Sequence, residues 1–168
     1  MNGFEEIFPL IQEIKDEEMK KKVVECWKVA MRRGGWKNLD DVPFTLLLPD
    51  AGCLVDHVNR VAGMAYAVGK KRGDVDMDLL ITGAVLHDVG KLLEYERVDG
   101  GTRKSYLGKI LRHPVSGAAL AAEVGLNDKV VSIIASHSKE GNFVERIPEG
   151  IIVHHCDFID FEIAGGKK

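Results

Sequence analysis

An adjacent imidazole and carboxylate occur inside an otherwise apolar stretch of this sequence. His87 and Asp88 lie within ITGAVLHDVGKLLEY, residues 81–95, among Ile, Ala, Val and Leu residues. Burying two such polar groups is costly unless each finds a hydrogen-bonding or charged partner. The pair therefore predicts partners elsewhere in the chain.

Four further polar side chains lie on the apolar faces of other predicted helices. They are His57, His113, His137 and Asp157. Each is three, four or seven residues from aliphatic or aromatic residues, a spacing that places them on one side of a helix. Several isolated buried polar groups would destabilise the fold, whereas a shared cation satisfies them together.

The residue types narrow the choice of cation. Imidazole and carboxylate donors without thiolates suit Fe, Mn, Ni, Co or Zn better than Ca or Mg. A structural zinc site would normally be closed by four ligands and would favour cysteine. Six candidate ligands around Asp88 instead predict two divalent transition-metal ions, about 3.5–4 Å apart, with Asp88 as the bridge.

The composition is that of a soluble globular protein with one domain. The chain has 168 residues, of which 45% are hydrophobic and 29% are charged, enough to bury a core. The net charge of −3 gives no reason to expect a nucleic-acid or anionic-membrane partner. No apolar run approaches the ~18 residues of a membrane-spanning helix, and the acidic N-terminus lacks the pattern of a signal peptide. Cys26, Cys53 and Cys156 lack CxxC spacing, so we expect reduced thiols in a cytoplasmic protein.

Helical periodicity extends over most of the chain, and alternating strands are not evident. The spacing predicts an all-α, compact bundle of about six to eight helices. Residues 1–45 form a helical extension packed on a metal-binding domain at 46–168, as one structural unit. Asp50 is a candidate N-cap for a helix over 51–71, and Asp76 or Asp78 for the helix that carries the His-Asp pair. A small hairpin is expected near Gly100-Gly101, and later helices are expected at 113–124, 127–137 and 149–164.

The order His57, His87-Asp88, Asp157 resembles the HD-domain superfamily of metal-dependent phosphohydrolases. The stretches LLITGAVLHDVGK (79–91) and IIVHHCDFID (151–160) carry this resemblance, which covers about residues 50–163. It implies an HD-domain-like helical bundle in which the four named residues hold the first metal. It also implies that His113 and His137 hold a second metal, with Asp88 bridging.

One departure from the family pattern restricts the expected substrate. Binuclear members that cleave cyclic dinucleotides carry a paired histidine and a Gly-Tyr-Pro signature after the position of His137. Residues 135–150 read ASHSKEGNFVERIPEG, with a single histidine and no such signature. Cleavage of cyclic dinucleotides is therefore not expected.

The resemblance implies hydrolysis of a phosphate ester or anhydride in a small phosphorylated substrate, for which a nucleotide is the expected class. Asp88 would orient the metal-bound hydroxide, and Lys91 would meet the phosphate as a catalytic or substrate-binding cation. Residues 91–113 hold six basic side chains, among them Arg112, and three acidic ones, which form either a basic rim that attracts an anionic substrate or a solvated loop face. His154, one turn before Asp157, would orient that carboxylate or contact substrate. No long nucleic acid is expected, because aromatic and basic residues are not interleaved.

Two alternatives from other classes remain open at this point. A minority of HD-domain proteins, similar to myo-inositol oxygenase, use the same six ligands to hold two irons and activate oxygen. A non-catalytic, nucleotide-binding regulator is the second alternative, although such a protein need not keep a full ligand set. The sequence equally leaves homo-oligomerisation open.

Overall fold

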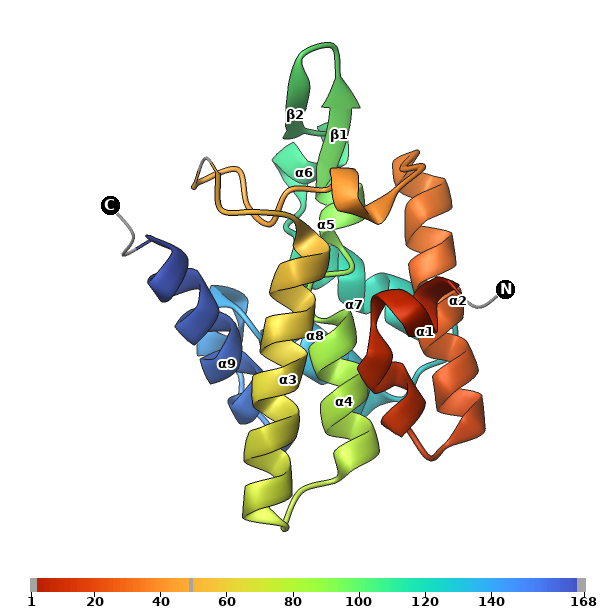
Figure 1. The fold of residues 1–168 in the computed structure, drawn as a ribbon, viewed down its shortest axis with the longest axis vertical. Helices are drawn as coiled ribbons and strands as arrows, with labels where there is room; N and C mark the ends of the chain where they lie inside the picture. The colour runs from red at the N-terminus through yellow and green to blue at the C-terminus, as the bar shows by residue number, and fades with distance from the viewer. Residues whose placement is uncertain (1–2, 49, 166–168) are drawn as a thin grey trace.

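Helices dominate the part of the chain that the computed structural model describes, residues 3–48 and 50–165 (Figure 1). With η denoting a 3-10 helix, the elements in chain order are α1 (Gly3–Ile7), η1 (Pro9–Glu13), α2 (Glu17–Gly34), η2 (Leu39–Asp41), α3 (Leu54–Arg72), α4 (Met77–Leu86), α5 (Lys91–Glu94), β1 (Tyr95–Val98), β2 (Gly101–Lys104), α6 (Tyr106–Ile110), α7 (His113–Glu123), α8 (Asp128–Ser136), η3 (Lys139–Phe143) and α9 (Pro148–Gly165). The predicted all-α class is confirmed.

Short polar side chains set the starts of the helices. Asp76 caps α4, because its carboxylate accepts hydrogen bonds from the backbone N–H groups of Asp78 and Leu79. The prediction that Asp50 caps α3 is wrong, since α3 begins at Leu54 with Cys53 as its N-cap residue. An isolated antiparallel bridge to Pro43 holds Cys53 extended, so the helix cannot begin earlier.

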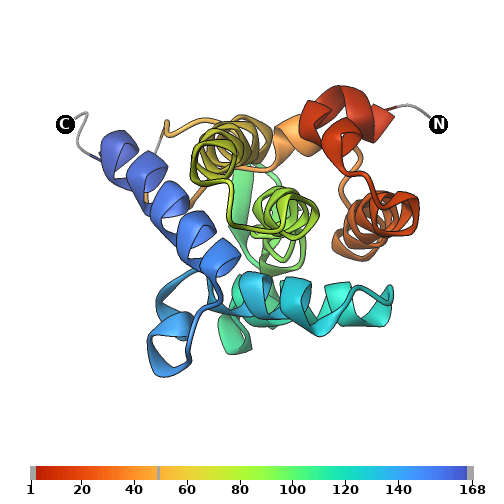
Figure 2. The same ribbon diagram turned by 90° about the horizontal axis from the view of Figure 1, so that it is seen from below.

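Helices α3 and α4 form the centre of the molecule. Viewed from below, they are seen end-on, with α9, α7 and α2 arranged around them (Figure 2). Every residue of α4 from Leu79 to Leu86 is buried, as expected for a helix covered on all sides. Polar groups at the end of this helix are consequently held deep inside the protein.

The His-Asp pair lies where the central helix breaks. The sequence predicts a helix that carries the pair, but α4 ends at Leu86, just before His87, and α5 begins only at Lys91. Between them the backbone bonds to the third residue back, with Val89 N–H donating to the Leu86 carbonyl. The break turns Asp88 away from the helical stack and toward the ends of neighbouring helices.

The N-terminal segment shares the core of the rest of the chain. Phe8 and Trp27 are fully buried and stack with ring centroids 4.6 Å apart. They belong to the same hydrophobic cluster as the buried residues of α3, α4 and α8. A division of the chain near residue 45 stays a prediction.

The expected hairpin is present and projects from one end of the molecule, at the top of Figure 1. Strands β1 and β2 are antiparallel, with Tyr95 opposite Lys104 and Val98 opposite Gly101. The tip is therefore Asp99-Gly100, one residue earlier than predicted, and Gly100 takes a φ of 88° there. Within the described residues no helix is both long and apolar enough to cross a membrane.

The absence of a side chain at Gly90 allows the start of α5 to lie against the start of α7. A Cβ on Gly90 would lie 2.1 Å from the carbonyl oxygen of His113, so Gly90→Ala should force α5 and α7 apart. We expect a loss of about 2 kcal/mol or more in the free energy of unfolding, from urea denaturation of the metal-free protein. Gly63→Ala in α3 is the matched control, because its Cβ would meet nothing within 4 Å, and alanine there should be neutral or stabilising. Equal effects of the two substitutions would contradict this account.

Candidate metal centre

The six side chains singled out from the sequence meet at one point in the structure. They come from the first turn of α3, the break after α4, the first residue of α7, the residue after α8 and the middle of α9. Their ligand atoms form two groups, within each of which all atoms lie within 4.8 Å of one another. The first group is His57, His87, Asp88 and Asp157, and the second group is Asp88, His113 and His137.

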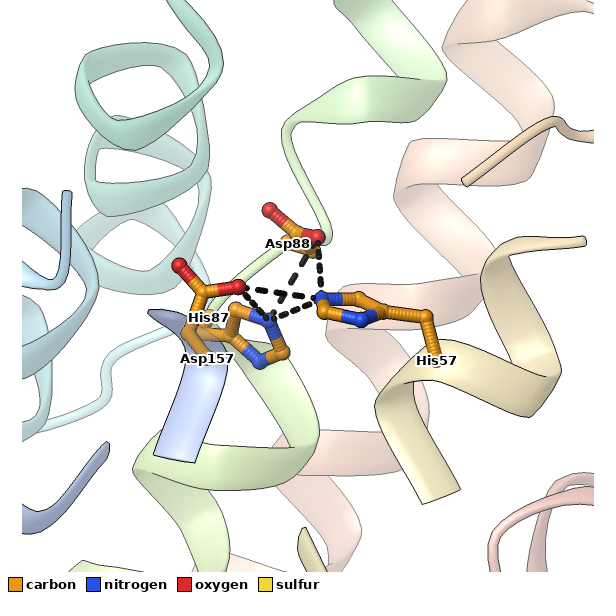
Figure 3. Close-up of side chains that lie close together, drawn as sticks. All are labelled: His57, His87, Asp88 and Asp157. Carbon is orange, nitrogen blue, oxygen red and sulfur yellow. Dashed lines mark hydrogen bonds and ion pairs between the residues drawn. The ribbon is translucent and has the colours of Figure 1, made fainter. Parts of the chain in front are cut away.

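The first group is a tight cluster of nitrogen and oxygen atoms (Figure 3). His57 Nε2 lies 3.2 Å from Asp88 Oδ2 and 3.1 Å from Asp157 Oδ1. It is also 3.1 Å from His87 Nε2. The four side chains thus point at a common centre from α3, the end of α4, and α9.

The second group uses the other oxygen of the shared carboxylate. His113 Nε2 lies 3.1 Å from Asp88 Oδ1, and His137 Nε2 lies 3.5 Å from the same atom. Asp88 therefore presents Oδ2 to the first group and Oδ1 to the second, which is the arrangement of a bridging carboxylate.

Two of the imidazoles are oriented by the helices that they terminate. His87 and His137 are the C-cap residues of α4 and α8. Their Nδ1 atoms lie 2.7 Å from the carbonyl oxygens of Ala84 and Ile134, which are among the carbonyls that a helix end leaves free. Since a carbonyl can only accept, Nδ1 carries the proton, and Nε2 presents a lone pair to Asp88 when the ring is neutral.

The other two imidazoles are oriented by buried carboxylates. His57 Nδ1 lies 2.7 Å from Asp160 Oδ2, and His113 Nδ1 lies 2.6 Å from Glu94 Oε2. Glu94 also accepts the backbone N–H of His113 at 2.7 Å. Each group therefore has one imidazole supported by a carboxylate and one supported by a backbone carbonyl.

The donor set fits a bound cation. With both rings neutral and protonated at Nδ1, His57 Nε2 and His87 Nε2 would face each other as lone pairs 3.1 Å apart in a fully buried position. Asp88 Oδ2 and His137 Nε2 have no hydrogen-bond donor, although both are buried. Unpaired buried acceptors are costly, and a divalent ion in each group would satisfy them.

Electrostatics keep the carboxylates of the site ionised. Burial alone would raise the pKa of Asp88, but Lys91 and then His87 hold it well below its usual range. Burial would lower the pKa of His57, yet the hydrogen bonds that it donates to carboxylates, led by Asp157, raise its pKa to about 9. For His137 burial prevails, and its pKa is lowered. The ionised carboxylates therefore favour a positive charge between them, which the proton of His57 supplies in the absence of a metal and a divalent ion would supply in its place.

Lys91 lies inside the site. Only 5% of the residue is exposed, and its Nζ lies 2.6 Å from Asp88 Oδ2, without hydrogen-bond geometry to that atom. It donates to the Phe44 carbonyl at 2.7 Å. Lys91 thus ties the shared carboxylate to the segment that follows η2.

A cavity of about 210 Å³ opens over this centre, with Asp88, Lys91, His113 and Asp157 in its lining. Arg112 lines it as well. A larger groove of about 540 Å³ beside α2 contains none of the ligand candidates.

The structure does not bring His154 into this cavity. Its Nδ1 lies 2.6 Å from the carbonyl oxygen of His137, and its ring lines a shallow surface depression with Arg146 and His155. Its predicted contact with substrate stays a prediction, and its observed contact is with the backbone of the residue after α8.

The basic rim is narrower than the residue count over 91–113 indicated. Arg97 is paired with Asp41 and Arg103 with Glu96, and neither arginine lines the cavity. Ion pairs with acidic side chains compensate these two charges away from the cavity. A count of charges over a sequence segment does not show such pairing.

Sequence reasoning missed the two carboxylates that support imidazoles. Glu94 is one of the three acidic side chains counted over residues 91–113, and Asp160 lies in the stretch 151–160 without an assigned role. The one available signal was helical spacing, since Glu94 follows Lys91 by three residues and Asp160 follows Asp157 by three.

Comparisons with known proteins agree with this geometry. The family model for the HD domain matches residues 54–161, which is well over half of the chain. The protein therefore belongs to the HD-domain family. No solved structure gives a significant match.

Three curated relatives have similar identities but different coverage. The dihydroneopterin 2′,3′-cyclic phosphate phosphodiesterase of Methanocaldococcus jannaschii is 31% identical, over 95% of this chain and 69% of that protein. The tRNA (cytidine(56)-2′-O)-methyltransferase of Thermoplasma volcanium is 32% identical, over 68% of this chain and 33% of that protein. Ribonuclease Y of Pseudothermotoga lettingae is 30% identical, over 68% of this chain and 20% of that protein. The chain thus spans a fifth to about two thirds of these relatives.

Each of the two supporting carboxylates, Glu94 and Asp160, should affect metal affinity only at the group whose imidazole it orients. Glu94→Gln keeps the shape of the side chain but removes its charge, so affinity at the second group should fall about 10- to 100-fold, and Asp160→Asn should do the same at the first group. Calorimetric titration with Mn²⁺ would measure both. Glu123→Gln, which alters only a surface pair with Arg33, should leave both affinities unchanged. Equal losses at both groups in either variant would contradict the assignment.

Proposed function

We propose that the protein is a metal-dependent phosphohydrolase with a binuclear centre. His57, His87, Asp88 and Asp157 would hold one divalent ion, and His113, His137 and Asp88 the other. The ligand chemistry suits Fe, Mn, Ni, Co or Zn. The observation that carries the proposal is the division of Asp88, with one oxygen facing each group, at the floor of a cavity.

The ions would supply a hydroxide nucleophile near neutral pH and polarise the phosphoryl oxygens. Side chains of the protein would position the nucleophile and the phosphate. Asp88 fixes the separation of the two groups and orients the nucleophile, and Lys91 balances its charge from within the cavity. Arg112, at the cavity wall, would stabilise charge that develops on the phosphate.

The proposed substrate is a small phosphate ester or anhydride, with a nucleotide as the expected class. A relative that acts on a 2′,3′-cyclic phosphate supports a phosphodiester. The cavity of about 210 Å³ is below the ~300–1,000 Å³ typical of drug-sized ligands, which favours a mononucleotide over an oligonucleotide.

A screen of metals against substrates tests the activity. Protein freed of metal by chelation would be reconstituted with each of the five metals and assayed on nucleoside monophosphates, triphosphates, 3′,5′- and 2′,3′-cyclic nucleotides and a generic phosphodiester. We expect metal-dependent product release with at least one class. The His87→Ala variant is the control for contaminating phosphatases. Oxygen uptake by the iron-loaded protein without phosphate chemistry would overturn the proposal in favour of an oxygenase.

Substitution of the shared carboxylate should affect both metals. Asp88→Asn removes the bridging charge, so both affinities should fall more than about 100-fold, beyond the loss typical of an outer-shell partner. His113→Ala should mainly empty the second group. Metal content by plasma mass spectrometry should then approach two ions per chain in the wild type and one in His113→Ala. Loss of both ions in His113→Ala, with an unchanged unfolding midpoint, would contradict a separate second site.

A further inference from the structure

The cavity over the metal centre has two chemically different sides. One side is apolar and consists of the segment after η2 and one face of α9, with Leu46, Phe158 and Phe161 in the lining. The lining also includes three cations from three separate elements, which form its cationic side: Lys104 at the end of β2, Arg112 before α7 and Lys139 in η3. This lining suits a ligand that carries both an anionic group and an apolar group.

The cationic side keeps its positive charge. Arg112 Nε lies 3.2 Å from Glu140, and half of its side chain is exposed. Lys104 is 3.7 Å from Glu94, which already accepts two hydrogen bonds from His113. Lys139 has no ion pair within the described residues. Three cations against two partly engaged carboxylates leave this side positive.

Two aromatic rings of the apolar side, Phe44 and Phe161, pack against each other beside His57. Phe44 stacks on the His57 imidazole, with centroids 3.9 Å apart and planes at 25°. Phe161 packs its edge against Phe44 at 6.0 Å. Phe44 thus holds the His57 imidazole in place, which occupies one face of the Phe44 ring, while Phe161 contacts Phe44 and not an imidazole.

Phe158 differs from the other two rings. It is half-buried, directly follows Asp157 and lines the cavity. Its aromatic neighbour is His154, at a centroid distance of 4.7 Å and an angle of 53°, and His154 does not line the cavity. Phe158 therefore has an aromatic surface available to a ligand next to one of the proposed metal ligands.

We propose that the substrate is a phosphate ester that carries a flat heterocycle, and that Phe158 is its specificity-determining residue. This rests on the proposed function, because the phosphate is placed over Asp88. The phosphate end lies toward Lys104, Arg112 and Lys139, and the heterocycle lies on Phe158. Stacking on an aromatic ring depends on the π-face and not on a hydrogen-bonding pattern, so Phe158 selects for a ring without selecting one base.

The test compares two cyclic phosphodiesters that differ only in the heterocycle. These are adenosine 2′,3′-cyclic phosphate and methyl β-ribofuranoside 2′,3′-cyclic phosphate, assayed with the full chain and its most active metal. The wild type should show a higher kcat/KM for the adenosine compound. In Phe158→Leu the ratio of the two kcat/KM values should fall about five- to thirtyfold, since leucine keeps apolar contact but has no aromatic face. Phe158→Met should give the same fall, and Phe158→Trp should retain the ratio.

Phe143→Leu is the matched control, because Phe143 is 92% exposed and does not line the cavity. Its ratio should equal that of the wild type. No preference in the wild type, or an unchanged ratio in Phe158→Leu, would overturn the inference.

A failure of the proposed function is distinguishable from a failure of this inference. If no metal supports hydrolysis of either compound, binding of AMP and ribose 5-phosphate would be measured by calorimetry with the metal-loaded protein. Tighter binding of AMP that Phe158→Leu weakens would uphold the inference without the hydrolysis. Equal affinities, or binding of neither compound, would overturn it.

Discussion

The convergence of buried acceptors on Asp88 is the constraint on which the rest of the structure depends. Four imidazoles have their Nδ1 atoms bonded to carbonyls or carboxylates, so their Nε2 lone pairs face the two oxygens of one aspartate. Such an arrangement is repulsive unless a cation or proton lies between the groups. The ends of α3, α4, α7 and α8 and the middle of α9 are placed so that a cation bound in each group would relieve this repulsion.

The break after α4 makes this convergence possible. A helix buried on all sides can carry a polar pair only where its backbone turns, because a side chain in its middle would face apolar neighbours. At its end, His87 satisfies a free carbonyl of its own helix through Nδ1. Gly90 then brings α5 against the start of α7, which sets the distance from Asp88 to His113.

Local pattern was enough to predict the six clustered side chains but not the groups that orient them. The chain has only six histidines against 26 acidic residues, and inward-facing spacing marked each candidate. Glu94 and Asp160 are two of 26 acidic residues, and their roles depend on contacts across more than a helical turn. For the same reason the charge count over-stated the rim: Arg97 is neutralised by Asp41, 56 residues earlier. The N-cap of α3 was missed because a tertiary strand-like bridge to Pro43 fixes Cys53.

Direct contacts link Asp88, at the base of the cavity, to Phe44 in its apolar lining. Lys91 joins Asp88 to the Phe44 carbonyl, and the Phe44 ring stacks on His57. The backbone of residue 44 is therefore fixed by the shared carboxylate, while its side chain fixes a neighbouring imidazole. Loss of the Lys91 side chain would remove its contacts with Asp88 and with the Phe44 carbonyl together. The segment that carries Phe44 would then shift relative to the two groups of ligand candidates. The position of the apolar lining is therefore coupled to the position of Asp88 by direct contacts, and no hinge between the two is needed.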